Sequence, residues 1–297
     1  MDNSLLKAGL RTGEIKMSLK RVFVLTSLAM VAFAGNSLLC RMALRSSQID
    51  PASFTSIRIL SGAVVLFLVT RTRRVSTVGS GDWSSALALF GYAAGFSYAY
   101  VDLPAGIGAL LLFGAVQVTM VGYGLTTGER LVVRQSSGLA LALAGLVGLL
   151  LPGLSAPPPG GAALMIGAGV AWGIYSIRGK TKGDATCKTA GNFLRAAPLA
   201  LGLNLAMLPS TRPATLGITC AVASGALTSG IGYAIWYSAI RELKATQAAT
   251  VQLSVPVIAA AGGIVFLGET LSARLLVASM AILGGVALVV IDKPTSR

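Results

Sequence analysis

Ten long runs of apolar residues follow one another along the chain, separated by short polar segments. A helix needs about 20 mostly apolar residues to cross the hydrocarbon core of a bilayer. The pattern therefore predicts an all-α membrane protein with ten transmembrane helices. The predicted spans are 22–40, 52–70, 83–101, 103–124, 137–152, 162–179, 190–208, 215–239, 245–266 and 273–291.

Several of the connections are too short to reach a distant helix. Little more than the letters VDLPAG separates the third span from the fourth, so these neighbours must run antiparallel. The clearest break is SAPPPGG at 155–161, near the middle of the chain. We expect it to separate two groups of five spans.

The composition agrees with a membrane protein. Hydrophobic residues make up 54% of the chain and charged residues 11%, whereas soluble domains carry about 25% charged residues. With the N-terminus inside, 18 of the 24 Lys and Arg residues fall in cytoplasmic segments and 4 in outer loops. Because Lys and Arg concentrate in cytoplasmic loops, we expect both termini in the cytoplasm. The net charge of +14 then reports topology in a cell inner membrane and predicts no nucleic-acid partner.

The second half of the chain repeats the first at a shift of about 140 residues. LTTGERLVVR, from Leu125, aligns with VFLGETLSAR, from Val265. Because each half holds five spans, an odd number, the halves would enter the membrane in opposite senses, an arrangement known from secondary transporters. We predict a tail at 1–20, repeats at 21–152 and 162–292, and a connector at 153–161. The aligned pairs are Gly128 and Gly268, Glu129 and Glu269, Leu131 and Leu271, and Arg134 and Arg274.

These motifs resemble an EamA-type member of the drug/metabolite transporter superfamily. The similarity is strongest at 243–290, where a small-residue-rich span with a central Pro256 ends at Gly-Glu and precedes a span with a Gly-Gly pair. The first half keeps Gly-Glu but has Val116 where Pro is expected, so we expect that helix to be straighter. The resemblance implies a ten-helix basket that moves small metabolites outward.

Aromatic and polar residues in four of the spans are most similar to those of bacterial aromatic amino acid exporters. The narrower resemblance implies that the protein exports aromatic or other neutral amino acids through a central cavity. Multidrug export and proton-coupled export by the same fold are the alternatives. We expect a monomer or a weak homodimer in the lipid bilayer, with a small molecule as its partner.

Two arginines, Arg58 and Arg195, fall inside equivalent spans of the two halves. A charge within a span is rare and is a candidate functional group. Each could capture a substrate carboxylate at the mouth of a cavity. Each could instead reach the interface or bind helix-end carbonyls and so stabilise the bundle.

Rings and amides within the spans are the candidate substrate contacts. Buried amides must find partners in hydrocarbon, so they face the protein interior, where helix–helix contact is as plausible as substrate contact. Aromatic residues near helix ends usually anchor the membrane interface, which we expect of Trp83, Tyr123 and Tyr237. The candidates for the cavity are Asn36, Tyr98, Gln117, Trp172, Tyr175, Asn192, Trp236 and Gln252.

The last two spans contain candidate gating residues. Pro256 removes a backbone hydrogen bond and predicts a kink, and Gly268 lets the chain leave that helix. Glu269 is expected to lie at the start of the tenth helix, where a carboxylate favours the positive end of the helix dipole.

The sequence favours a carrier over an enzyme or a channel. It has no His, three scattered Cys residues and no Asp or Glu in the middle of a predicted span. We therefore expect no metal, no cofactor, no catalytic residue and no strong ion coupling, so transport should be facilitative.

Overall fold

The computed structural model describes residues 17–47, 49–75, 80–150, 157–180, 183–207, 215–270 and 272–290. Within these ranges every regular element is helical. The elements are α1 (Leu19–Ser46), α2 (Pro51–Thr72), α3 (Trp83–Ala99), α4 (Ala105–Thr126), α5 (Val133–Leu150), α6 (Pro159–Gly179), α7 (Ala185–Met207), α8 (Thr215–Ala223), the π-helix η1 (Ser224–Ile231), α9 (Gly232–Ala239), the 3₁₀ turn η2 (Ile240–Glu242), α10 (Ala245–Gln252), α11 (Val255–Leu267) and α12 (Ala273–Val290).

Each of the ten predicted spans corresponds to a helix or to a series of helices. Six stretches of the described chain are long and apolar enough to cross a membrane. The other four predicted spans correspond to the helices α3, α5, α7 and α12. The six stretches are α1, α2, α4, α6, Thr215–Glu242 and Ala245–Leu267.

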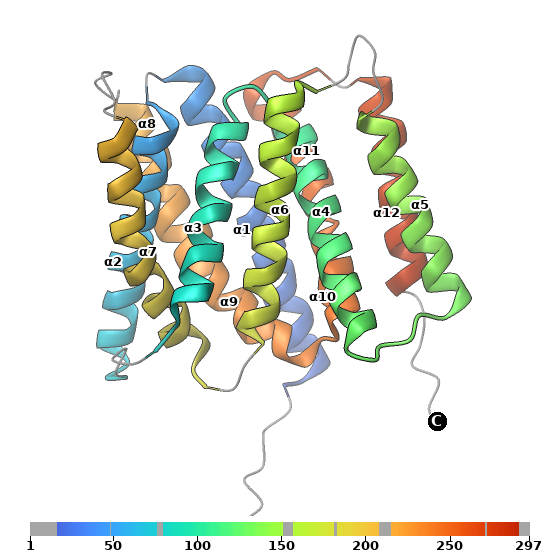
Figure 1. Ribbon diagram of the computed structural model, residues 1–297, viewed down its shortest axis with the longest axis horizontal. Helices are drawn as coiled ribbons and strands as arrows, with labels where there is room; N and C mark the ends of the chain where they lie inside the picture. Colours follow the sequence, from blue (N-terminus) through green and yellow to red (C-terminus); the bar gives the residue numbers. More distant parts are fainter. Residues whose placement is uncertain are drawn as a thin grey trace, which may run out of the picture.

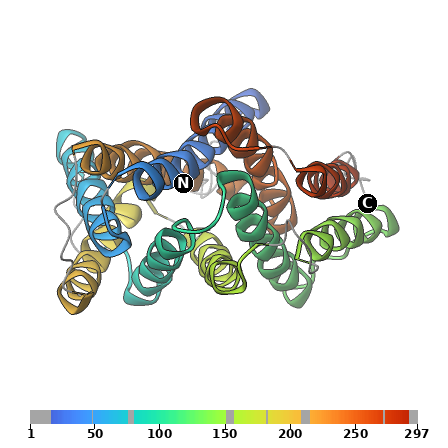
Figure 2. The same cartoon turned by 90° about the horizontal axis from the view of Figure 1, so that it is seen from above.

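The helices stand side by side along one direction (Figure 1). We call the side on which α1 begins and α12 ends the lower face, and the opposite side the upper face. The pair formed by α5 and α12 stands at one end of the molecule in both views (Figures 1 and 2). Residues 1–16 of the predicted tail and 153–156 of the predicted connector lie outside the described residues, as do the basic residues Lys182, Arg212, Lys293 and Arg297.

The ninth span is interrupted, as its proline predicted. Helix α10 ends at Gln252, and α11 begins at Val255 with Pro256 in its first turn. The equivalent helix α4 runs without a break from Ala105 to Thr126. At the end of α11, Gly268 adopts a left-handed conformation with φ of 60°, which glycine reaches without a side-chain clash.

A π-helical segment lies in the middle of the eighth span and crosses α2 closely. A Cβ at Gly225 would collide with the backbone of Arg58, so the two helices meet at glycine. π-Helical turns are rare and often occur at functional sites. Here the wide turn places Ser229 and, one turn later, Tyr233 against α2.

Glu269 stabilises a helix, but not the one that the sequence predicted. Its carboxylate accepts hydrogen bonds from the backbone N–H of Ala105, at 3.0 Å to both oxygens, in the first turn of α4. The Nε of Arg41 lies 3.5 Å from Oε1 of Glu269. The expected position at the start of the tenth helix was wrong, because α12 begins four residues later at Ala273. We call this contact the upper junction.

Glu129 makes the matching contact at the other face. Its carboxylate accepts from the backbone N–H groups of Ala245, at 3.1 Å, and Thr246, at 3.4 Å, in the first turn of α10. Nearby, the Nζ of Lys180 donates to the carbonyl oxygen of Leu243 at 2.7 Å. We call this contact the lower junction. Each glutamate thus follows the fourth helix of one half and caps the fourth helix of the other half.

Candidate functional site

Aromatic side chains from four helices, α1, α3, α6 and α9, meet in the interior of the bundle. Trp172 contacts Phe33 edge-on at a centroid distance of 5.3 Å and Tyr233 at 4.6 Å. Phe33 and Trp172 occupy equivalent positions of the two sequence repeats, so the halves touch through matching residues. We define the ring cluster as Phe33, Tyr92, Phe96, Trp172, Tyr175, Tyr233 and Trp236.

Arg58 of α2 lies against this ring cluster and is 1% exposed. Its Nε donates to the Oγ of Ser229 at 3.0 Å, and its Nη2 donates to the hydroxyls of Tyr92, at 2.9 Å, and Tyr233, at 2.7 Å. The guanidinium carbon also lies 4.9 Å from the ring centre of Phe96, within the range of a cation–π contact. A charged group is therefore held at the centre of the bundle by neutral partners.

Asn36 joins the same network from α1. Its Nδ2 donates to the Tyr92 hydroxyl at 3.0 Å, and its Oδ1 accepts from Ser224 at 2.6 Å. The amide therefore ties α1 to α3 and η1. These contacts correspond to the helix–helix role that was one of the two expectations for Asn36.

Three further candidates lie in the same interior. The Oε1 of Gln252 accepts from the indole N–H of Trp172 at 2.7 Å, which joins α10 to α6. The indole N–H of Trp236 is buried without a hydrogen-bond partner, and so is the Oε1 of Gln117. A transported solute could satisfy groups that the protein itself leaves unpaired.

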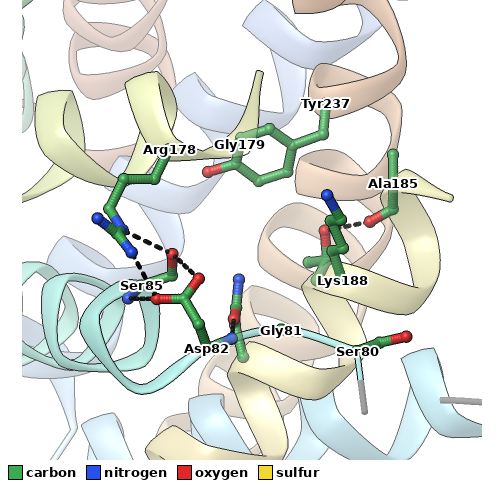
Figure 3. Close-up of a pocket in the computed structure, with 11 residues that line it drawn as sticks. Ser80, Gly81, Asp82, Ser85, Arg178, Gly179, Ala185, Lys188 and Tyr237 are labelled. Carbon is green, nitrogen blue, oxygen red and sulfur yellow. Dashed lines mark hydrogen bonds and ion pairs between the residues drawn. The ribbon is translucent and has the colours of Figure 1, made fainter. Parts of the chain in front are cut away.

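A polar pocket of about 420 Å³ opens at the lower face, where α3 and α7 begin and α6 ends (Figure 3). It contains the carboxylate of Asp82, the guanidinium of Arg178 and the ammonium of Lys188. Arg178 and Asp82 form an ion pair with an N–O distance of 2.8 Å. Although burial alone would raise the pKa of Asp82, hydrogen bonds from Ser85 and the pairing with Arg178 lower it to about 2.

The inner end of the pocket leads to the ring cluster. Asn192 lines the pocket, and its Nδ2 donates to the Tyr175 hydroxyl at 3.4 Å. Tyr237 also lines the pocket, and its hydroxyl donates to the Tyr175 carbonyl oxygen. Tyr175 in turn packs against Trp172 and Tyr233. Tyr175 therefore separates the pocket from the interior, where Arg58 lies.

Some expectations for single residues need correction. Tyr237 is buried beside Tyr175 and is not an interface anchor, whereas Trp83 and Tyr123 are exposed as predicted. Tyr98 is partly exposed near the end of α3 and is not a member of the ring cluster. Arg195 is partly exposed and donates to the carbonyl oxygens of Ser80 and Gly191, which is the stabilising role.

Two of the three hydrogen-bond partners of Arg58 were not singled out from the sequence. Tyr92 and Ser229 were not candidates, and neither were the charged groups of the polar pocket. Asp82 is the N-cap of α3, and Arg178 was counted only as a topology signal. The sequence does contain a signal for Tyr92, because it precedes Phe96 by four residues and the two rings therefore share one face of a helix. Both are buried in α3.

Among the described residues, no group of three or more His, Cys, Asp or Glu side chains could hold a metal ion. The interior offers hydrogen-bond donors, rings and one cation.

Comparisons with known proteins assign the family. Residues 159–291 match the model of the EamA-like transporter family. The chain is 55% identical over 271 residues to an uncharacterized protein of Pseudomonas aeruginosa, covering 91% of this chain and 94% of that protein. A solved crystal structure has a TM-score of 0.71 at 20% identity, covering 91% of this chain and 97% of the other. The protein therefore belongs to the EamA-like transporter family, a family of membrane transporters.

Proposed function

We propose that the protein exports amino acids, aromatic or other neutral ones, from the cytoplasm by facilitative alternating access. The observation that carries the proposal is the packed interior between the two halves, where we place the substrate chamber. It combines aromatic rings with amide and phenol groups, and a pocket with both signs of charge leads to it from the lower face. An amino acid zwitterion carries both charges, and its side chain can pack against the rings.

The two junctions support an inverted repeat with two gates. Glu129 and Glu269 make equivalent contacts at opposite faces, each to the half that it does not belong to. Opening one junction and closing the other would expose the chamber to each side in turn. On this proposal the lower face is cytoplasmic, because the Lys and Arg residues that follow the even-numbered spans lie there.

The absence of acids within the described spans supports facilitative transport. The described Asp and Glu residues lie at helix ends or in connections, and the chain has no His. Proton relays in pumps usually need such groups at depth. A multidrug exporter of cations would likewise be expected to place a carboxylate in its chamber.

The test is counterflow in liposomes that contain the purified protein. Liposomes loaded with unlabelled phenylalanine should accumulate labelled phenylalanine or leucine without a pH gradient. Preference for a cationic dye over both amino acids would support a multidrug exporter. Flux that appears only with an imposed pH gradient would support proton coupling.

A matched pair of tryptophans controls this experiment. Trp172 lies in the ring cluster, whereas Trp83 is 57% exposed at the start of α3. Trp172→Ala should lower counterflow by at least about tenfold, because it removes a large stacking surface and the partner of Gln252. Trp83→Ala should leave it within about twofold. Equal effects of the two changes would contradict a role for the ring cluster.

A further inference from the structure

We infer that Arg58 binds the carboxylate group of the transported solute, an inference that rests on the proposed function. It names the atoms of the chamber that recognise one chemical group. It also predicts which solutes the protein rejects, namely those whose carboxylate is masked or missing.

Arg58 lacks an anion. No carboxylate of the described chain lies within ion-pair distance of its guanidinium, whereas Arg41 and Arg178 each have one. A buried charge without a counter-charge is costly, and proteins usually pair it or neutralise it. Arginine cannot lose its proton under ordinary conditions. The site is therefore positively charged in the state that the structure describes.

The same site has more hydrogen-bond donors than acceptors. The Nη1 of Arg58 is buried with no hydrogen-bond partner. The hydroxyls of Tyr92 and Tyr233 both accept from Nη2, and they share one hydrogen bond of 3.2 Å with each other. Each hydroxyl has one proton, so one of the two phenolic protons has no acceptor among the described residues. A carboxylate supplies the missing acceptors and the missing charge together.

The shape of the guanidinium suits this ligand. Nε is held by Ser229 and Nη2 by the two tyrosines, so Nη1 is the nitrogen left for a ligand. Nη1 carries two N–H groups and can donate a charge-assisted hydrogen bond to one carboxylate oxygen. Tyr92 and Phe96 pack on the guanidinium at 5.0 and 4.9 Å, which fixes the orientation of its plane.

Arg195 is a comparison for Arg58, because its contacts have a structural role. It occupies the equivalent span of the other half, is partly exposed, and donates to two backbone carbonyl oxygens, Ser80 and Gly191. The protein backbone therefore supplies hydrogen-bond acceptors for the Arg195 guanidinium. Arg195→Gln is therefore the matched control for Arg58→Gln.

The experiment measures competition in the counterflow assay by three analogues that share one side chain: phenylalanine, phenylalanine amide and phenethylamine. In the unaltered protein, phenylalanine should compete at least about tenfold better than the amide, as expected for a charge-assisted hydrogen bond. Arg58→Gln should bring the acid and the amide within about twofold of each other. Arg195→Gln should keep the preference of the unaltered protein.

A second pair of variants keeps the test decisive if Arg58→Gln does not fold, which thermal unfolding followed by tryptophan fluorescence would reveal. Tyr92→Phe and Tyr233→Phe keep the guanidinium and remove one hydroxyl each. Each should weaken competition by phenylalanine about threefold or more and leave that of the amide unchanged.

The outcomes separate the inference from the function on which it rests. If the unaltered protein moves acid, amide and amine equally well, or if the arginine and tyrosine variants keep the preference for the acid, Arg58 does not bind the carboxylate. If the unaltered protein transports none of the amino acids, the proposed function fails, and the inference fails with it.

Discussion

The upper and lower junctions use the same residue type in the same sequence context, but they hold the two faces with different strength. At the upper junction the Glu269 carboxylate accepts from one backbone N–H at 3.0 Å through both oxygens and also pairs with Arg41. At the lower junction Glu129 spreads its contacts over two N–H groups at 3.1 and 3.4 Å. The polar pocket opens beside the lower junction.

This difference indicates how an inverted repeat can rest in one state. Two identical junctions would give no preference between faces. On the proposed alternating-access mechanism, an additional ion pair at one face would bias the equilibrium toward closure there. A second pocket, of about 280 Å³, lies at the upper junction and is lined by Glu269.

Removal of each carboxylate charge should give the largest difference in stability between the two junctions. Glu269→Gln leaves Arg41, whose side chain is 11% exposed, without its counter-charge. It should lower the free energy of unfolding in detergent by about 2–3 kcal/mol. Glu129→Gln should lower it by about 1 kcal/mol or less. Denaturant titration of both variants checks this, and equal losses would mean that the junctions are equivalent.

A double-mutant cycle should isolate the ion pair. Arg41→Gln combined with Glu269→Gln should show a coupling free energy of about 1 kcal/mol. Lys180 donates to Leu243, and within the described chain it does not reach ion-pair distance of Glu129. The cycle of Lys180→Gln with Glu129→Gln should therefore couple by less than about 0.5 kcal/mol. A larger coupling free energy at the lower junction than at the upper one would contradict the view that the upper junction is the stronger of the two.

Substitution of the two glycines next to the carboxylates should give a smaller difference in stability between the junctions. A Cβ at Gly263 would collide with Oε2 of Glu269, and one at Gly124 would lie 2.8 Å from Oε2 of Glu129. Alanine is more favourable than glycine within a helix by about 1 kcal/mol, which opposes the loss of the contact. Gly263→Ala should still be destabilising by about 1 kcal/mol, because it displaces the ion pair as well. Gly124→Ala should be close to neutral, and thermal unfolding of the two variants measures the difference.

The ion pair of the polar pocket should give the smallest effect. The pKa of Asp82 is lowered from 3.8 to about 2, so its stabilisation is present above pH 4 and is lost as the pH falls from about 4 to about 2. Its side chain is 49% exposed, so screening limits the effect to about 1 kcal/mol or less.

Asp82→Asn tests this prediction cleanly, because asparagine is also a good N-cap for α3. The melting temperature of the unaltered protein should fall more steeply between pH 4 and pH 2 than that of the variant. Parallel curves would show that the Asp82–Arg178 pair contributes nothing to stability.

The sequence predicted the helices well because each one is a local property. Twenty consecutive apolar residues force the backbone to satisfy its own hydrogen bonds within the segment. The break at Pro256 and the left-handed Gly268 are local as well. Each follows from the geometry of a single residue.

The site was harder to predict because its contacts join distant segments. Arg58 and Tyr233 are 175 positions apart in the chain. The hydrophobic periodicity of the sequence does not predict that they come into contact. The prediction for Glu269 failed for the same reason, since the helix that it caps lies 164 positions away. A carboxylate beside a helix start in the sequence was mistaken for a cap of that helix.

The pair of α5 and α12 has a consequence for the order of synthesis. Most of the neighbours of α5 belong to α12, the last helix of the chain, and Gly285 lets the two backbones approach so closely that a Cβ there would strike Gly138. During insertion α5 therefore waits in the bilayer without its main partner while the whole second half is made. A ribosome that stalls before Ala273 leaves behind a helix with a lipid-exposed stripe of small residues, which membrane quality control could recognise.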